Sequence, residues 1–298
     1  MPSWGDTPVV VTGATGFIGA ALAAKLAELG ATVHAVSRRA VTADGPVHWH
    51  VADLTDPEQT AELIRAVKPH TVFHLASAVT GARDVDLVGP TLAGNLVGAV
   101  SLMTAAARES PSTRVILAGS VEERTALSPY AVAKAAATRY AEMFHQLWSL
   151  HVTVLRVAMV YGPGQPDVSK LVPYVTRTLL AGEQPRLASG TRLVDWVYID
   201  DVVDAFLRAA RTERAAGRVL DIGSGTQLSI RDTVELLAGL VGGDVTPAFG
   251  AIPDRPLDNA QVSDPAEAGE VLGWRPTTTL REGLERTIGW YAAAGNDR

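Results

Sequence analysis

Tyrosine and lysine stand four residues apart in the segment SPYAVAK, residues 128–134. If this segment is helical, Tyr130 and Lys134 lie one turn apart on the same face. The chain has only four lysines and six tyrosines, so independent placement would give about 0.08 such pairs. Because an ammonium favours a nearby phenolate, we expect a lowered pKa for Tyr130, as acid–base chemistry at carbonyl and alcohol groups requires. Ser120, at the end of the preceding predicted strand, would orient a substrate carbonyl, which the alternative of an ordinary surface pair does not explain.

A second chemical signal is the glycine-rich segment VVVTGATGFIG, residues 9–19. It places Gly13, Gly16 and Gly19 between a predicted strand and a predicted helix. Without Cβ atoms in the way, backbone N–H groups and the helix N-terminus can approach a pyrophosphate. The alternative is that the glycines only permit close packing. Their position directly after the first predicted strand favours nucleotide binding.

Cationic side chains follow the next predicted strand, which ends in Ser37, Arg38 and Arg39. An acid at this position would take the 2′-hydroxyl of an adenosine ribose, whereas a 2′-phosphate calls for cations. Two guanidinium groups and a hydroxyl can hold such a dianion, and no carboxylate stands there to repel it. The alternative is a solvated basic turn. These residues favour NADP(H) over NAD(H).

The elements that must position these residues alternate between strand and helix. Strand-like segments at residues 8–12, 31–37, 70–77 and 113–120 are separated by segments with helical spacing. This alternation predicts an α/β fold with a doubly wound parallel sheet covered on both faces. We expect a dinucleotide-binding domain over residues 1–165, to which residues 196–225 return, and a smaller C-terminal α/β substrate lobe over residues 166–195 and 226–298.

Composition limits the kinds of partner. The 298 residues carry a net charge of −6, which offers no electrostatic footprint for nucleic acids or anionic membranes. The chain has no cysteine, and its histidine spacing does not offer three ligands at one point, so we expect no metal. No apolar run reaches bilayer-spanning length, and the N-terminus carries no targeting signal. We therefore expect a cytoplasmic protein with a small-molecule partner, which binds neither nucleic acid nor membranes.

In this order along the chain, these motifs resemble the extended short-chain dehydrogenase/reductase family, which includes the nucleotide-sugar epimerases and dehydratases. The resemblance also draws on ADLTD at residues 52–56, VFHLAS at 72–77, VYGPG at 160–164 and VDWVYIDDV at 194–202, and it covers nearly the whole chain. It implies a sheet of the Rossmann type. It also implies that Lys134 holds the nicotinamide ribose and that Tyr130 and Ser120 meet the reacting oxygen, with the positive nicotinamide further lowering the pKa of the phenol.

The resemblance completes the expected cofactor site. It places Asp53 and Leu54 beside the adenine, and Ala76 and Ser77 along the cofactor. The full set of expected cofactor-binding residues is Gly13, Thr15, Gly16, Phe17, Ile18, Gly19, Ser37, Arg38, Arg39, Asp53, Leu54, Leu75, Ala76, Ser77, Asn95, Tyr130 and Lys134.

Departures from the family pattern concern the substrate. Met159 stands where many members carry an asparagine, and the segment between Ser120 and Tyr130 is short, which predicts a more open mouth to the site. Arg192 lies two residues before Val194 and so on the same face of a predicted strand, where it could contact a phosphate. Arg255 resembles a second arginine that holds the diphosphate in nucleotide-sugar members. The alternative for either arginine is a surface salt bridge.

These expectations favour one function over three others. The leading hypothesis is NADPH-dependent reduction of a keto group on a nucleotide-activated deoxysugar, of the dTDP-4-keto-6-deoxyhexose 4-ketoreductase type. The alternatives are an NAD-dependent nucleotide-sugar 4-epimerase, a catalytically silent NADP-binding sensor protein and a reductase of non-nucleotide ketones. The resemblance also suggests a homodimer that pairs the helices around residues 95–109 and 130–149.

Overall fold

The computed structural model of the chain describes residues 4–42, 45–80, 82–254 and 261–296. The chain forms two compact units, each assembled from separate stretches of sequence. The first comprises Met1–Val157, Val203–Asp221 and Ala266–Trp274, and the second comprises Ala158–Val202, Ile222–Pro265 and Arg275–Arg298.

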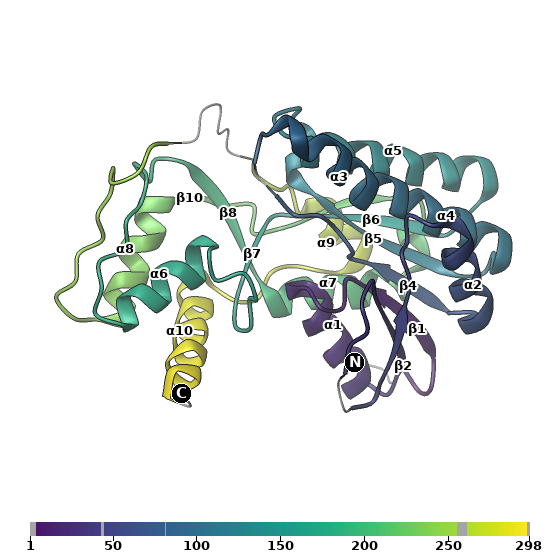
Figure 1. The fold of residues 1–298 in the computed structure, drawn as a ribbon, viewed down its shortest axis with the longest axis horizontal. Coiled ribbons are helices and arrows are strands. Elements are labelled where there is room, and N and C mark those ends of the chain that lie inside the picture. The colour runs from purple at the N-terminus through teal and green to yellow at the C-terminus, as the bar shows by residue number, and fades with distance from the viewer. Residues whose placement is uncertain (1–3, 43–44, 81, 255–260, 297–298) are drawn as a thin grey trace. The chain divides into compact units, whose positions relative to one another are not determined.

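A seven-stranded sheet forms the centre of the first unit (Figure 1). Its strand order is β3 (Val47–Val51), β2 (Thr32–Ser37), β1 (Pro8–Thr12), β4 (Thr71–His74), β5 (Arg114–Ser120), β6 (Val152–Val157) and β9 (Val219–Ile222). Neighbouring strands run parallel; Val11 of β1, for example, lies opposite Ala35 of β2 and Phe73 of β4. The prediction of a doubly wound parallel sheet is confirmed. The chain order reverses between β1 and β4, and ligands of such sheets bind beyond the carboxyl ends of the strands at this reversal.

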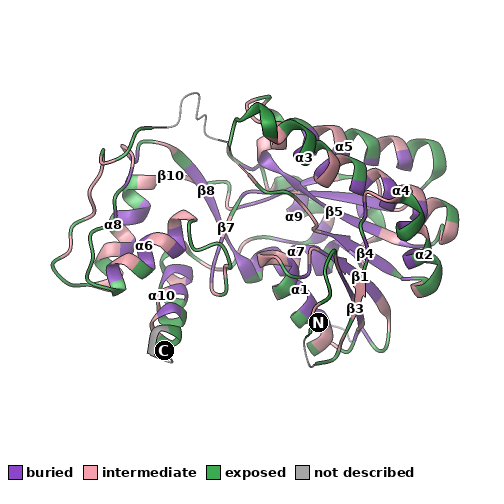
Figure 2. Cartoon of the chain, viewed as in Figure 1, coloured by how far each residue is buried: buried purple, intermediate pink, exposed green. Residues whose placement is uncertain are grey.

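Helices cover both faces of this sheet. Figure 1 shows α2 (Pro57–Val67), α4 (Gly98–Glu109) and α5 (Pro129–Trp148) on one face, and α1 (Phe17–Glu28) on the other. Both α2 and α5 begin with proline after a capping side chain, Asp56 and Ser128 respectively, which fixes where each helix starts. The inner strands are buried along most of their length (Figure 2), and Val10, Val72 and Leu102 belong to one core cluster.

The helical stretch Val85–Glu109 is not one regular α-helix. It runs through a 3-10 turn (Val85–Leu87), α3 (Val88–Leu92), a π-helical turn (Ala93–Val97) and α4. An 18-residue window of it has a mean hydropathy of 1.4, and 39% of that window is buried. By length and composition this helix could cross a membrane, so the expectation that no segment is long and apolar enough is wrong. An interior helix of a water-soluble protein passes the same test.

The described residues of the second unit include a three-stranded sheet and the helices α6, α8 and α10. The strand order is β10 (Gln227–Ser229), β8 (Leu193–Tyr198) and β7 (Met159–Tyr161), with β7 parallel and β10 antiparallel to β8. The helices α6 (Leu171–Leu180), α8 (Ile230–Val241) and α10 (Leu280–Asn296) pack with one another. Tyr161 contacts the rings of Trp196 and Tyr198 edge-on, with centroids 5.9 Å and 5.7 Å away. This aromatic cluster forms part of the unit's own core.

Candidate active site

Backbone atoms crowd two glycines of the turn between β1 and α1, Gly13 and Gly19. Gly13 has a φ of +69°, and a Cβ there would lie 2.6 Å from the backbone N of Ala76. A Cβ at Gly19 would lie 2.1 Å from the carbonyl oxygen of Gly13, and one at Gly16 would lie 3.2 Å from it. In the part of the chain that the structure describes, no side chain caps the N-terminus of α1. Its first-turn N–H groups can therefore meet an anion, and the turn fits a pyrophosphate.

Thr12, the last residue of β1, ties the glycine turn to the loop after β4. Its hydroxyl oxygen accepts hydrogen bonds from Leu75 N at 3.2 Å and Ala76 N at 3.1 Å, and lies 2.9 Å from Nδ1 of His74. Since a hydroxyl has one proton to give, Thr12 donates to Nδ1 and the imidazole carries its own proton on Nε2. Burial lowers the pKa of His74 to about 3, so the ring stays neutral. Leu75 and Ala76 thereby lie beside Gly13 at the reversal of strand order.

The π-helical turn positions Asn95, whose side chain is buried. Its Oδ1 accepts hydrogen bonds from Ser77 Oγ at 2.7 Å and Ala78 N at 2.8 Å, and its Nδ2 donates to the carbonyl of Ala78 at 3.3 Å. Asn95 is thus fully engaged with the loop after β4. It shapes the segment that the sequence predicts to run along a cofactor.

The end of β2 presents its cationic residues to solvent. Ser37 Oγ accepts a hydrogen bond from Arg39 N at 3.3 Å, and both Arg38 and Arg39 are exposed. Hydrogen bonds from Thr55 lower the pKa of Asp53, and the nearby charge of Arg38 lowers it further. Leu54 beside it is buried. Arg38 therefore lies close enough to Asp53 to lower its pKa, and these two residues of the expected cofactor site lie near each other.

The expected catalytic residues come together in the first unit. Ser120 ends β5, and Tyr130 and Lys134 lie one turn apart on α5, as the sequence predicts. Lys134 is buried, and its Nζ donates to the carbonyl of Ala118 at 2.7 Å while lying 6.0 Å from the centre of the Tyr130 ring. Ser120 lies close enough to Tyr130 to lower the pKa of the phenol. Two hydroxyls and an ammonium therefore share one small region at the carboxyl end of β5.

The expected lowering of the Tyr130 pKa by Lys134 is wrong. Burial raises the pKa of Tyr130 to about 12, against a smaller lowering by the hydrogen bond with Ser120. Burial also lowers the pKa of Lys134 to about 8. Desolvation of the buried phenol is the largest cause of its raised pKa, and the ammonium of Lys134 donates to a backbone carbonyl on β5. At neutral pH the tyrosine is therefore protonated and most of the lysine is charged.

Sequence reasoning missed Glu123, in the short helix η3 (Val121–Arg124) that follows β5. Its Oε1 accepts a hydrogen bond from Ser120 N at 2.7 Å, and its Oε2 accepts one from Thr138 Oγ1 at 2.7 Å. The signal was present as Ser-x-x-Glu, which is typical of a reciprocal cap at a helix N-terminus. The structure contains that cap, with Ser120 Oγ accepting from Glu122 N at 3.2 Å.

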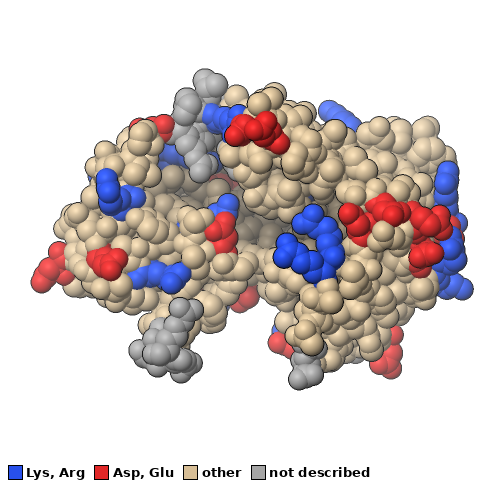
Figure 3. All heavy atoms as spheres, in the orientation of Figure 1, with Lys and Arg blue, Asp and Glu red and all other residues tan. Residues whose placement is uncertain are grey.

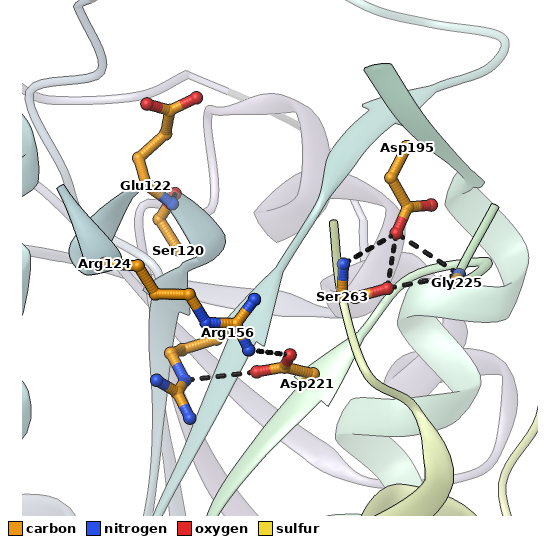
Figure 4. A network of polar contacts seen from close by, with 8 residues as sticks. All are labelled: Ser120, Glu122, Arg124, Arg156, Asp195, Asp221, Gly225 and Ser263. Atoms are coloured by element: carbon orange, nitrogen blue, oxygen red, sulfur yellow. Dashed lines mark hydrogen bonds and ion pairs between the residues drawn. The ribbon is translucent and has the colours of Figure 1, made fainter. Parts of the chain in front are cut away.

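Ion pairs with Asp221 connect the same short helix to the sheet. Figure 4 shows Arg124 of η3 and Arg156 of β6 converging on Asp221 of β9, while the carboxylate of Glu122 points away from them. Asp221 is buried, and its Oδ1 lies 3.2 Å from Nε of Arg156. The helix that carries Glu123 is thereby fastened to the sheet.

Of the residues expected to bind the substrate, Ser120 belongs to the first unit and Arg192 to the second. Arg192 directly precedes β8, and its carbonyl accepts a hydrogen bond from Ile230 N at 2.9 Å. Arg255 lies outside the described residues. Asp195 of β8 is buried and accepts hydrogen bonds from Ser224 N at 2.8 Å and from Gly225 and Ser263, as Figure 4 shows. This carboxylate ties three segments of the second unit together.

Charges on the surface are mixed in sign. On the face drawn in Figure 3, Lys and Arg side chains form several separate groups with Asp and Glu among them. Histidines meet on β2 and β3, where His34 Nδ1 lies 2.8 Å from His50 Nε2, and burial lowers the pKa of both rings. Within the described ranges, no group of three or more His, Asp or Glu side chains could hold a metal ion.

The chain matches the model of a known protein family. Residues 9–223 match the model of the NAD dependent epimerase/dehydratase family. That stretch contains the glycine turn, Ser120, Tyr130 and Lys134.

Individual relatives resemble the chain over nearly its whole length. UDP-glucose 4-epimerase of Mycolicibacterium smegmatis is 32% identical over 95% of this chain and 97% of its own. The dTDP-6-deoxy-L-talose 4-dehydrogenase (NAD(P)(+)) of Kitasatospora kifunensis is 30% identical over 95% of each chain. Among solved structures, UDP-glucose 4-epimerase of Thermotoga maritima with UDP-glucose matches with a TM-score of 0.88 and 28% identity, over 96% of this chain and 99% of that one.

Proposed function

The chain belongs to the NAD dependent epimerase/dehydratase family, and from that premise we propose that it reduces a keto group on a nucleotide-activated deoxysugar with NADPH. It is an enzyme, an NAD(P)-dependent oxidoreductase of the extended short-chain dehydrogenase/reductase type. The finer proposal is a 4-ketoreductase of the type that acts on a dTDP-4-keto-6-deoxyhexose.

One observation carries the choice of a reductase. Arg38 and Arg39 stand exposed at the end of β2 beside Ser37, and Asp53, whose pKa the charge of Arg38 lowers, accepts hydrogen bonds from Thr55. Such a site suits the 2′-phosphate of NADP(H). A cofactor that exchanges between turnovers suits a net reduction.

The residues around Ser120 would then carry the proton chemistry. When bound, the nicotinamide would supply the hydride that reaches the ketone carbon. Tyr130 would donate its phenolic proton to the substrate oxygen as negative charge develops there, and Ser120 would donate a hydrogen bond to the same oxygen. Lys134 would hold the nicotinamide ribose with its ammonium. The high pKa of Tyr130 favours this reading, because a reductase needs its proton donor protonated before the reaction.

The sugar nucleotide is proposed from the second unit and from the relatives. Arg192, with Arg255, would hold the diphosphate, since guanidinium groups pair with phosphate oxygens in two parallel hydrogen bonds. The printed names of the relatives supply the substrate class, because they act on UDP- and dTDP-linked sugars.

A 4-epimerase with tightly held NAD is the second candidate. The similarity to UDP-glucose 4-epimerases of two bacteria favours it as directly as the 4-dehydrogenase favours the reductase. The two candidates differ in one respect that can be measured: an epimerase consumes no external NADPH. A silent NADP-binding sensor is disfavoured by the retention of Ser120, Tyr130 and Lys134 together.

The deciding experiment is anaerobic mixing of the purified enzyme with NADPH and a panel of nucleotide-linked keto sugars. We expect absorbance at the reduced-nicotinamide band to fall with at least one dTDP-linked 4-keto sugar, and free dTDP to inhibit competitively. Conversion of UDP-glucose to its 4-epimer without loss of NADPH would instead establish the epimerase. Reduction of free ketones with no inhibition by dTDP would move the assignment to a non-nucleotide reductase.

We also propose a homodimer formed through α5 and the helical stretch before it. Val132, Tyr140 and Leu147 are 51%, 41% and 65% exposed, and their spacing sets them on one face of α5. Val88 and Leu92 of α3, which packs near α5, are also about half exposed. Contiguous exposed apolar surface of this kind marks association sites.

Light scattering at micromolar concentration is expected to give twice the mass of one chain. The double variant Val132→Glu and Leu147→Glu should give a monomer, because it places charges in the apolar face. Trp290→Glu, at an exposed aromatic residue on α10, should leave the dimer intact. A monomeric native protein would refute the dimer.

A further inference from the structure

The carboxylate of Glu123 links two of the elements that carry the proposed reacting groups. One oxygen accepts from the backbone N of Ser120, at the end of β5, and the other accepts from Thr138, one turn beyond Lys134 on α5. Both hydrogen bonds are 2.7 Å long, which is short and typical of bonds to an ionised acceptor. A rigid bridge thus spans the gap between the strand that ends in Ser120 and the helix that presents Tyr130.

The surroundings make this carboxylate electrostatically important. The pKa of Glu123 is raised, because burial outweighs the lowering by its hydrogen bonds and by the charges of Lys134 on α5 and Arg156 on β6. Glu123 in turn raises the pKa of Lys134, against a larger lowering by burial. It also raises the pKa of Tyr130, as does Glu122 from the same short helix.

We propose that Glu123 is a positioning residue, whose carboxylate fixes Ser120 against helix α5 and acts as the counter-charge of the buried ammonium of Lys134. This inference rests on the proposed function only in naming Ser120, Tyr130 and Lys134 as the reacting groups. It assigns to Glu123 no contact with substrate or cofactor.

The competing explanation is that Glu123 only caps η3. A reciprocal cap satisfies the N–H of Ser120 and begins the short helix. A cap acts through its hydrogen bonds alone. A purely capping role therefore predicts that Glu123 has no effect on the titration of Lys134, which lies on another helix. The titration of Lys134 therefore separates the two explanations.

The test uses the full chain labelled with ¹³Cε-lysine, without added cofactor. Only four lysines are present, and Lys134→Arg identifies the resonance of Lys134 by its loss. In the native protein we expect Lys134 to titrate near pH 8. In Glu123→Gln, which keeps the side-chain shape and removes the charge, it should titrate at lower pH. Glu122→Gln removes the adjacent charge and should leave the Lys134 titration where it is.

Turnover provides the second readout. Glu123→Gln should lower it by about 10- to 100-fold, a size typical of small misplacements of catalytic groups, and its pH profile should move to lower pH. Thr138→Val removes the anchor on α5 but keeps the charge, so turnover should fall while Lys134 titrates as in the native protein. If Glu123→Gln does not fold, Thr138→Val still tests the bridge, and native turnover in that variant would overturn it.

If the Lys134 titration is unchanged in Glu123→Gln, or shifts equally in Glu122→Gln, the proposal is overturned and Glu123 only caps η3. The titration requires neither NADPH nor a sugar. A failure of the proposed reaction would therefore appear in the keto-sugar panel while the Lys134 titration still gave its own answer.

Discussion

Replacing Tyr130 with phenylalanine is expected to lower turnover by about 100- to 10,000-fold, with NADPH affinity nearly unchanged. Negative charge on a substrate oxygen is costly in a partly dry site unless an acid lies within hydrogen-bond reach. The phenol lies beside Ser120, and burial raises its pKa to about 12, so it is protonated and available as the donor at neutral pH. Steady-state rates and a fluorescence titration of NADPH binding measure the two quantities separately.

Tyr140→Phe is the matched control, since Tyr140 lies on the same helix and is 41% exposed. It should leave both turnover and binding near native values. Ser120→Ala should cost less than Tyr130→Phe because it removes one hydrogen bond and not the proton, whereas Lys134→Ala should damage turnover and NADPH affinity together. Near-native turnover in Tyr130→Phe would show that Tyr130 is not the proton donor. The role that the family resemblance implies for it would then be wrong.

The double variant Arg38→Ala and Arg39→Ala is expected to weaken NADPH binding by about 100-fold or more while NADH binding changes little. Each guanidinium contact to a 2′-phosphate is worth about 1.5 to 3 kcal/mol, and both would be lost. NADH has no phosphate at this position. Equilibrium titrations with both cofactors give the ratio directly, and the effect should shrink as salt is raised.

The matched control is Arg218→Ala and Arg281→Ala, which removes the same net charge from two exposed ion pairs. It should leave the preference for NADPH intact. If the double variant at residues 38 and 39 also keeps that preference, the turn after β2 is merely solvated. An NAD-dependent epimerase would then fit the chain better than an NADPH-dependent reductase.

Local patterns in the sequence predicted the elements of the first unit well. An apolar strand, three glycines and a helical run predict a strand, a tight turn and a helix at residues 8–28, and the structure has β1 and α1 there. The four-residue spacing of Tyr130 and Lys134 places them one turn apart because that spacing is a property of any α-helix. The parallel sheet followed from the alternation of such elements.

Features that depend on tertiary packing were not accessible in this way. The pKa of Tyr130 was predicted in the wrong direction, because proximity in sequence does not reveal that the ammonium of Lys134 donates to Ala118 or how deeply the phenol is desolvated. The π-helical turn at Asn95 leaves no mark in apolar spacing. Glu123 was visible as part of a cap, yet its bond to Thr138 joins residues 15 positions apart on different elements.

The crowding around the glycine turn bears on how such motifs are interpreted in distant descendants. Gly13 and Gly19 are required by the chain's own backbone, since a methyl group at either would overlap peptide atoms whether or not a nucleotide is bound. Gly16 is less constrained, because its nearest atom is 3.2 Å from the position of a Cβ. A lineage that abandoned catalysis and lost its cofactor would still retain the outer two glycines as long as it folded. Substitutions would accumulate first at Gly16, so a glycine at that position is the better marker of a site that still binds a nucleotide.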